Sequence, residues 1–323
     1  MTWTAFLFIL ISVFLHAGWN LLLKEHKPSL AFCLLLSSSA LLCMSPFIFL
    51  CPLPRMGLPW KFWAFLGGSV VGELLYTSSL AHGYKLFDFS LFYPLARALP
   101  VVMLAIGSFF LPLGRQRPGT WALIGMGVLF FGCLCMASRS KNKRADDAPE
   151  RPFWLLWVWA LIGATGTCLY TGFDHAATNL VKDSGVVVWG LMPSCAYFCL
   201  VEVGLVVGNG LIVAFSPEER KAFREIFGKT WTPLVAGFFD ALCYSLVLVA
   251  YTKATNASMV FAFRQLGLPV GFLAGVFFLH EKARRKKVIG LAAIVAGLLI
   301  SVLPTGWPDI VLFLWRQSIH EFF

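Results

Sequence analysis

The chain has 323 residues, of which 59% are hydrophobic and 13% are charged, and its mean hydropathy is +0.77. This composition excludes an ordinary soluble domain, in which about half of the residues are apolar and about a quarter are charged. The net charge of +10 does not indicate a nucleic-acid-binding protein, because lysine and arginine collect in the cytoplasmic loops of membrane proteins.

Long apolar stretches follow one another along the chain and predict an all-α membrane protein. Each stretch can cross about 30 Å of hydrocarbon as a helix, whereas a β-barrel would show short alternating segments. Charged or proline-rich breaks divide the chain into ten predicted transmembrane helices. Their spans are 4–23, 29–51, 62–83, 89–112, 120–138, 153–178, 186–214, 232–252, 257–280 and 288–306.

The polar breaks predict the domain organisation. Segment 139–152 is the most polar and is predicted to link a first five-helix unit, 1–138, to a second, 153–306. The break "SPEERKAFREIFGKTW" (216–231) is predicted to carry a short helix at the membrane interface. The tail, 307–323, is too short and too charged to span the bilayer, and we expect it to lie on the membrane surface.

Segments of the two halves align in the same order, which predicts an internal repeat. "GSFFL" (107–111) aligns with "GVFFL" (275–279), and "IGMGVLFFGCL" (124–134) aligns with "IGLAAIVAGLL" (289–299). Because each unit has an odd number of helices, two such units must insert in opposite orientations. Inverted repeats are typical of secondary transporters, whose solute site lies between the repeats near the middle of the membrane. The predicted fold is therefore ten transmembrane helices in two inverted five-helix repeats.

Ionisable side chains within the predicted helices are candidates for function, since an unpaired charge that faces lipid costs about 2.5–3.5 kcal/mol. These residues are His16, Glu73, Arg97, Asp174, His175, Glu202, Asp240 and Arg264. Residues three or four apart share a helix face, which groups several of them with polar neighbours. The groups are His16, Asn20 and Lys24; Glu73 and Tyr76; Tyr93 and Arg97; Tyr170 and Asp174; and Asp240 and Tyr244. Gln265 follows Arg264 in the turn that matches Arg97 in the other half.

A structural role is the alternative for each of these groups. Buried polar residues also hold helices together in membrane bundles, and Arg97 and Arg264 could neutralise the acids in fixed ion pairs. We favour the structural role for Glu202, which stands alone on a long predicted helix. For His175, the two roles have equal weight.

Sequence motifs of cofactor sites and enzymes are missing. The nine cysteines form no C-x-x-C pair, so disulfide and zinc sites are weakly indicated, and we expect the cysteines to act as small hydrophobic residues. The chain contains no G-x-x-x-x-G-K-[ST] loop, no H-E-x-x-H and no G-x-S-x-G. We therefore expect no metal, no cofactor and no enzymatic activity.

Four stretches resemble the EamA-type proteins of the drug/metabolite transporter superfamily. They are "HAGWNLLLK" (16–24), "FSLFYPLARALP" (89–100), "YTGFD" (170–174) and the segment 263–300. The resemblance implies a ten-helix, inverted-repeat carrier that moves small organic metabolites, often outward, through a central cavity. It also implies cytoplasmic termini. The breaks after the odd-numbered predicted helices are the more basic ones, which favours external termini, so the orientation stays open.

The predicted cavity combines cationic, acidic and aromatic side chains. Arg97 lies between Pro94 and Pro100, and both the charge and the helix breaks are tolerable where a helix faces a wet cavity. The predicted substrate-binding residues are Trp19, Asn20, Tyr93, Arg97, Tyr170, Asp174, Arg264 and Gln265. His16 and Lys24 complete the polar face of the first helix, and the candidates for proton coupling are Glu73, Asp240, Tyr76 and Tyr244.

This mixture suits an amino acid or a similar amphipathic solute, because arginine captures a carboxylate and aromatic rings can hold an amine. We therefore expect a multi-pass protein of the bacterial inner membrane, monomeric or homodimeric, that exports such a solute by alternating access. Without an ATP-binding loop, the flow is either downhill or coupled to protons. The rival substrates are hydrophobic cations, which would use the acids, and the rival classes are a channel and an intramembrane enzyme. The expected partners are the solute, lipid and protons, without nucleic acid.

Overall fold

The computed structural model describes residues 3–25, 28–51, 53–87, 92, 95–97, 99–103, 119–136, 152–183, 192–253, 260, 263–270, 273 and 285–301. All regular secondary structure in these residues is helical, which confirms the predicted all-α class. The elements are α1 (Trp3–Glu25), α2 (Leu30–Met44), α3 (Pro46–Leu50), η1 (Leu53–Arg55), α4 (Trp60–Leu86), α6 (Thr120–Met136), α7 (Phe153–Asp183), α8 (Met192–Phe215), α9 (Pro217–Ile226), α10 (Thr232–Lys253) and α13 (Arg285–Ser301).

Several helices are long and apolar enough to cross a membrane, so the protein is an integral membrane protein. Among the described residues they are Trp154–Lys182, Met192–Phe215 and Thr232–Tyr251. The segments Leu30–Met44 and Pro46–Arg55, which meet at a bend of 44°, count as a fourth if the bent pair is one span and not a re-entrant loop. Predicted helices 89–112 and 257–280 fall partly outside the described residues, and ten spans remain a prediction.

The bend between α2 and α3 corrects one predicted element. The sequence predicts a single helix over 29–51, but α2 ends at Met44 and α3 begins at Pro46. Proline has no backbone N–H to donate, and its ring clashes with the preceding turn, so the helix breaks there. The start of α2 agrees with the prediction, because Ser29 caps the helix by accepting a 3.1 Å hydrogen bond from the N–H of Phe32.

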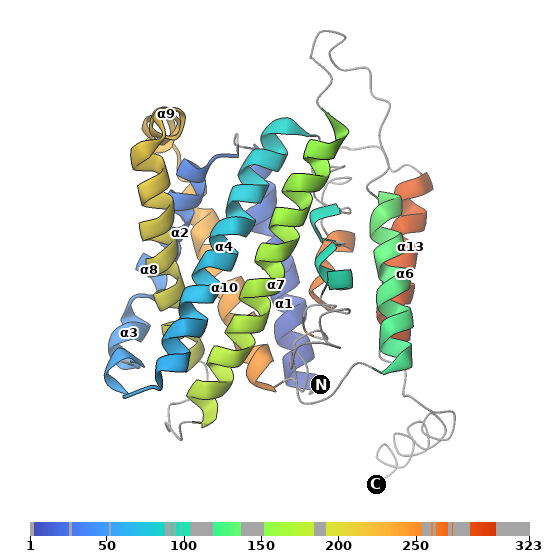
Figure 1. Ribbon diagram of the computed structural model, residues 1–323, viewed down its shortest axis with the longest axis horizontal. Helices are drawn as coiled ribbons and strands as arrows, with labels where there is room; N and C mark the ends of the chain where they lie inside the picture. The colour runs from blue at the N-terminus through green and yellow to red at the C-terminus, as the bar shows by residue number, and fades with distance from the viewer. Residues whose placement is uncertain are drawn as a thin grey trace.

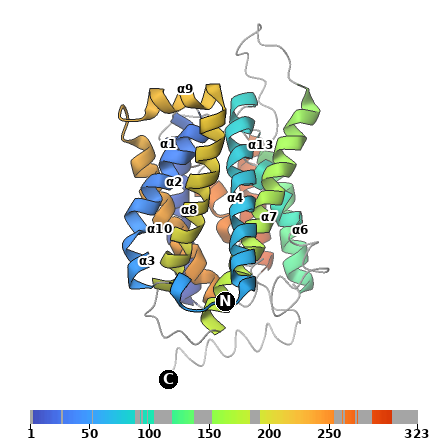
Figure 2. The ribbon, with the colours of Figure 1, turned by 60° about the vertical axis from the view of Figure 1, so that its left-hand side comes forward.

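Helix α9 lies within the break that is predicted to carry a short helix. Ser216 is its N-cap, Pro217 follows at the first position, and Glu218 and Glu219 stand in the first turn, where acids are favourable. Figure 2 shows α9 lying across one end of the bundle. A helix in this break is confirmed, and its place at the membrane interface remains a prediction.

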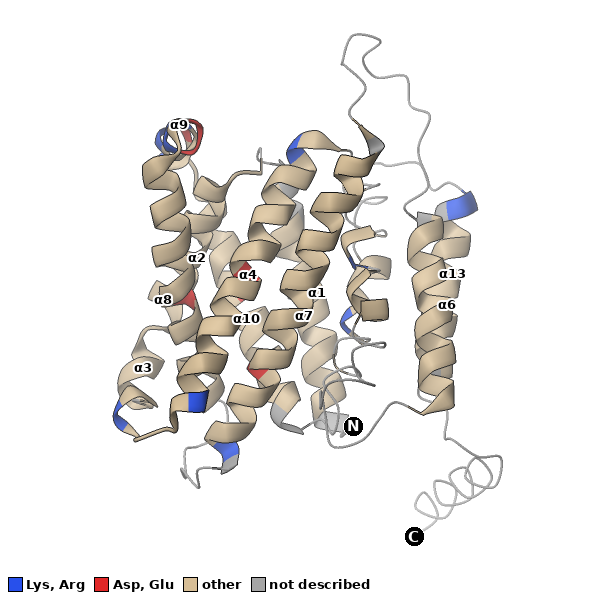
Figure 3. Ribbon diagram, viewed as in Figure 1, with Lys and Arg blue, Asp and Glu red and all other residues tan. Residues whose placement is uncertain are grey.

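The helices pack in pairs that join distant parts of the chain. Helix α4 packs on α7, α1 on α10, α2 on α8 and α6 on α13 (Figure 1). Acidic residues appear in the middle of the bundle, whereas most basic residues of the described part lie near helix ends (Figure 3). The hydrophobic core lies mainly among α1, α2, α4, α7, α8 and α10, and a smaller core joins α6 to α13.

Glycines bring α6 and α13 into close contact, in a reciprocal pattern. A Cβ atom at Gly132 would lie 2.7 Å from the carbonyl oxygen of Gly290, and one at Gly297 would lie 2.6 Å from the carbonyl oxygen of Gly125. Because residue number rises along one helix as it falls along the other, the pair is antiparallel. In the repeat predicted from sequence, Gly125 aligns with Gly290 and Gly132 aligns with Gly297. The contact from Gly132 to Gly290 therefore corresponds to the contact from Gly297 to Gly125.

Glycines also bring α4 and α7 together, beside the centre of the bundle. A Cβ atom at Gly72 would lie 2.7 Å from the amide nitrogen of Tyr170, and one at Gly166 would lie 2.5 Å from the carbonyl oxygen of Gly72. Each glycine stands four residues before a tyrosine, Tyr76 on α4 and Tyr170 on α7. The close backbone approach lets these two rings meet edge to face, with centroids 5.9 Å apart.

Candidate functional site

A cavity of about 60 Å³ lies between α1, α2, α4, α7, α8 and α10. Its polar walls are formed by His16, Ser37, Glu73, Thr77, Glu202, Asp240 and Arg264, and its aromatic walls by Trp19, Tyr76, Tyr170 and Tyr244. Leu23, Cys33, Leu36, Leu80, Val201, Leu205 and Cys243 complete the lining. The cavity is large enough for water, and its polar walls offer the partners that a bound water or solute needs.

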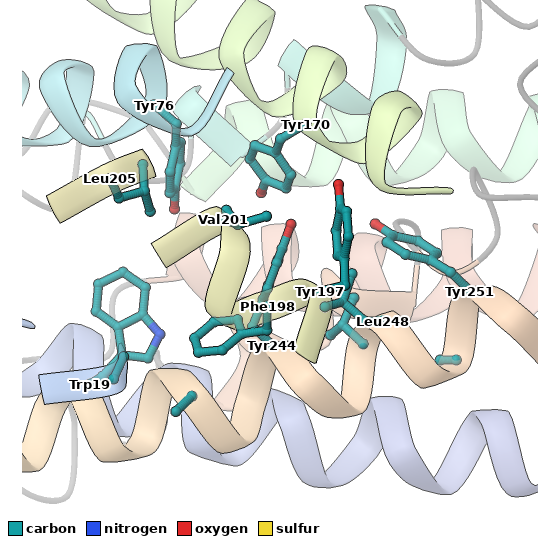
Figure 4. Close-up of a cluster of buried hydrophobic side chains, with 14 of the residues drawn as sticks. Trp19, Tyr76, Tyr170, Tyr197, Phe198, Val201, Leu205, Tyr244, Leu248 and Tyr251 are labelled. Carbon is teal, nitrogen blue, oxygen red and sulfur yellow. The ribbon is translucent and has the colours of Figure 1, made fainter. Parts of the chain in front are cut away.

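The aromatic wall is a chain of ring contacts between three helices. Tyr170 meets Tyr76 on one side and Tyr244 on the other, and the Tyr170–Tyr244 centroids are 6.1 Å apart. Figure 4 shows these three hydroxyl groups pointing into the space between the helices, with Trp19 across from them on α1. Such rings shield an apolar side chain and also attract a cation to their faces.

Helix α1 contributes an imidazole whose hydrogen bonding defines its tautomer. The indole N–H of Trp19 donates a 3.1 Å hydrogen bond to Nδ1 of His16. In a neutral imidazole with Nδ1 as acceptor, Nε2 carries the proton. Nε2 is buried and has no hydrogen-bond partner in the described part of the chain. His16 therefore presents an N–H donor at the cavity wall.

The other two residues of the polar face predicted for α1, Asn20 and Lys24, are not part of the cavity lining that the structure describes. Asn20 is buried, and its amide donates a 2.8 Å hydrogen bond to the backbone carbonyl of His16. It is not among the cavity-lining residues, so its assignment to the substrate site has no support from the cavity. The side chain of Lys24 lies outside the described residues.

Asp174 sits beside the cavity, enclosed by hydroxyl groups from three other helices. Its Oδ1 accepts hydrogen bonds of 2.5 Å from Ser69 on α4 and 2.8 Å from Tyr197 on α8. Its Oδ2 accepts a hydrogen bond from Tyr244 on α10. The side chain is fully buried and does not line the cavity. The sequence predicts that Asp174 binds substrate, whereas in the structure its oxygens bind protein hydroxyls.

The hydrogen bonds of Asp174 differ from one predicted side-chain pair and involve two residues that the sequence did not indicate. The sequence pairs Tyr244 with Asp240 on α10, but the Tyr244 hydroxyl donates to Asp174 on α7. Sequence reasoning missed Ser69 and Tyr197. Both lie in apolar stretches without a motif, and only the neighbouring helix α7 explains their position.

The acids on the cavity wall are Glu73, Asp240 and Glu202. Glu73 and Asp240 are half-buried, and the sequence predicts both as proton-coupling residues. Glu202 is only 2% exposed, and its Oε2 has no hydrogen-bond partner in the described part of the chain. The sequence favours a structural role for Glu202, but the structure places it on the cavity wall.

The cationic residues divide between the cavity and its surroundings. Arg264 lines the cavity, is buried, and holds its guanidinium carbon 5.9 Å from the centroid of the Tyr244 ring. Arg97 is buried close enough to His16 to act on it electrostatically, but it is not among the lining residues. Gln265 is buried without lining the cavity, and Tyr93 lies outside the described residues.

Comparisons with known proteins find similarity to a curated protein by sequence and to solved structures by fold. No protein-family model matches the chain. A curated protein of Lactobacillus johnsonii, which bears the provisional name of a ribose uptake protein, RbsU, is 23% identical over 227 residues, or 69% of this chain and 73% of that protein. A solved crystal structure has a TM-score of 0.66 at 15% identity and covers 94% of this chain and 97% of its own. At this identity the likeness shows a shared fold alone, and the EamA-type assignment stays a prediction.

Proposed function

We propose that this protein is a secondary transporter that moves a small organic solute across the membrane by alternating access. The observation that carries the proposal is the central cavity, where acids, a guanidinium and an imidazole meet inside a bundle of apolar helices. Ionisable groups at membrane depth are costly and characteristically mark solute or ion pathways. The name of the Lactobacillus relative, which refers to uptake of a small solute, supports the same class.

We also propose that the fold is built from two inverted five-helix repeats, 1–138 and 153–306. The reciprocal glycine contacts between α6 and α13 support this arrangement, because a two-fold axis in the membrane plane would produce them. The helix pairing is consistent with it. If α4 corresponds to α10 and α7 to α1, then the α4–α7 pair and the α10–α1 pair are the same contact in the two repeats.

For the substrate, we propose an amino acid or a similar amphipathic solute that leaves the cell. Arg264 is suited to bind a carboxylate, and His16 offers an N–H donor beside it. The rings of Tyr76, Tyr170 and Trp19 are suited to cover the apolar part of the solute.

Glu73 or Asp240 would exchange a proton during the transport cycle. The name of the Lactobacillus relative makes ribose the first alternative substrate to test.

A counterflow assay with purified protein in liposomes tests the transporter proposal. Liposomes are loaded with unlabelled leucine or ribose, and entry of the same labelled solute is followed over time. A carrier gives saturable accumulation that depends on the internal solute and is reduced in Arg264→Gln. Flux that rises linearly with concentration would instead indicate a channel, and the absence of flux with every solute class would contradict the proposal.

A further inference from the structure

We propose that Glu202, together with Asp240, binds the ammonium group of the transported solute. This inference rests on the proposed transport function and adds to it the chemical class of the substrate. In the part of the chain that the structure describes, three carboxyl groups, from Glu73, Glu202 and Asp240, face the same small cavity as one guanidinium, from Arg264. When these acids are ionised, a bound cation balances their charge, whereas a neutral sugar or a carboxylate does not.

Among the described residues, Glu202 is the cavity acid on which no cation is found to act. Arg264 acts electrostatically on Glu73 and on Asp240. The neighbours that act on Glu202 are Asp240, Glu73 and the hydroxyl of Ser37, none of which is a cation. The side chain of Glu202 is 2% exposed, and its acceptor atom Oε2 has no hydrogen-bond partner in the described residues. A buried carboxylate oxygen without a donor is unfavourable, and an ammonium group supplies both the donor and the charge.

The surroundings of Glu202 suit an organic ammonium group better than a metal ion. Trp19, Tyr76 and two neighbours of Glu202 on α8, Val201 and Leu205, line the same cavity as Glu202, and all four appear in the left half of Figure 4. Aromatic faces attract organic cations, and apolar side chains cover an attached alkyl group. The described residues contain no cluster of three or more histidine, cysteine, aspartate or glutamate side chains with the geometry of a metal site.

The test uses four probes that differ in their charged groups. 3-Methylbutylamine carries only an ammonium group, 4-methylpentanoate only a carboxylate, leucine both, and ribose neither. Their binding to purified full-length protein in detergent is measured by calorimetry. We expect the two ammonium-bearing probes to bind at least about tenfold more tightly than the other two. In Glu202→Gln, their affinity should fall by about 30-fold or more, as is common when one partner of a buried charge pair is lost. Binding of ribose should be unchanged.

Two further variants separate charge from folding. Glu218→Gln makes the same chemical change at an exposed position of α9 and should bind like the wild type. Asp240→Asn should weaken the ammonium-bearing probes in the same way as Glu202→Gln, and thermal unfolding confirms that each variant is folded. Preferential binding of ribose or 4-methylpentanoate, equal affinities in Glu202→Gln and wild type, or no binding of any probe would overturn the inference.

The counterflow assay keeps this inference distinct from the transport proposal. If ribose is transported and Glu202→Gln binds it normally while no amine binds, the protein is a transporter and the ammonium site is wrong. If the amine binds through Glu202 but no solute crosses the membrane, the ammonium site stands and the transport proposal fails.

Discussion

The hydroxyl of Tyr244 donates a hydrogen bond to Oδ2 of Asp174, and this contact joins α10 to α7 in the centre of the bundle. Tyr244 also lines the cavity, while Asp174 lies behind it. One tyrosine therefore forms part of the cavity wall and part of the hydroxyl cluster around a fully buried acid. A rearrangement of α10 at the cavity would change the hydrogen bonding of Asp174, so the two features are physically connected.

Removal of the Tyr244 hydroxyl should destabilise the protein. Tyr244→Phe leaves Oδ2 of Asp174 without that donor, and the loss of one donor to a buried group costs about 1–3 kcal/mol. We expect a lower Tm for the detergent-solubilised variant. Tyr251→Phe is the control, because the Tyr251 hydroxyl is equally buried but has no hydrogen-bond partner in the described residues. Equal Tm losses in both variants would contradict a specific role for the contact with Asp174.

Added methyl groups at the two reciprocal glycines should have matching effects. Gly132→Ala and Gly297→Ala each place a Cβ atom less than 3 Å from backbone atoms of the partner helix, so α6 and α13 must move apart. Overpacking of this kind costs about 1–3 kcal/mol. Both variants should lower the Tm by similar amounts, since the two contacts are equivalent. Gly127→Ala on α6 meets open space, and because alanine favours a helix over glycine, it should not lower the Tm. A large loss at only one of the two positions would argue against equivalent contacts.

Glu219 should matter more for stability than its ion-pair partner, Lys85. Glu219 is buried on α9; it accepts a 3.0 Å hydrogen bond from the backbone N–H of Ala31 and a 2.8 Å hydrogen bond from Lys85 Nζ. Glu219→Ala therefore releases the start of α2 as well as the end of α4, at a cost of about 1–3 kcal/mol. Lys85 is 39% exposed, so Lys85→Met should cost at most about 1 kcal/mol. Thermal unfolding measures both, and an equal or larger loss for Lys85→Met would show that the ion pair dominates.

Neutral variants of the half-buried acids should separate proton coupling from solute movement. Glu73→Gln and Asp240→Asn remove a carboxyl that could bind and release a proton, while the size of the side chain is kept. We expect both variants to lose accumulation driven by a proton gradient in liposomes, and at least one to retain exchange of solute. Proton movement is followed with a pH-sensitive dye inside the liposomes. Wild-type transport that neither moves protons nor depends on pH would leave a uniporter or an exchanger.

The sequence alone determined where helices form. Apolar runs and the breaks between them are local properties, so the predicted spans 120–138 and 232–252 correspond closely to α6 and α10. The helix in the polar break was predictable for a related reason, because the capping residue Ser216 and the first-turn acids follow one another in the chain. The alignment of glycines in the two halves likewise needed no coordinates.

Only the tertiary structure decided which faces of these helices meet. A membrane helix that is apolar on all sides carries little periodic signal, so its rotation in the bundle depends on its neighbours. For this reason, the sequence predicted a structural role for Glu202 and paired Tyr244 with Asp240, whereas packing placed Glu202 on the cavity wall and Tyr244 against Asp174. The partners of Asp174 come from α4, α8 and α10, and no local pattern links residues so far apart. The close approach of α4 and α7 at their glycines, which brings Tyr76 to Tyr170, is likewise a result of packing.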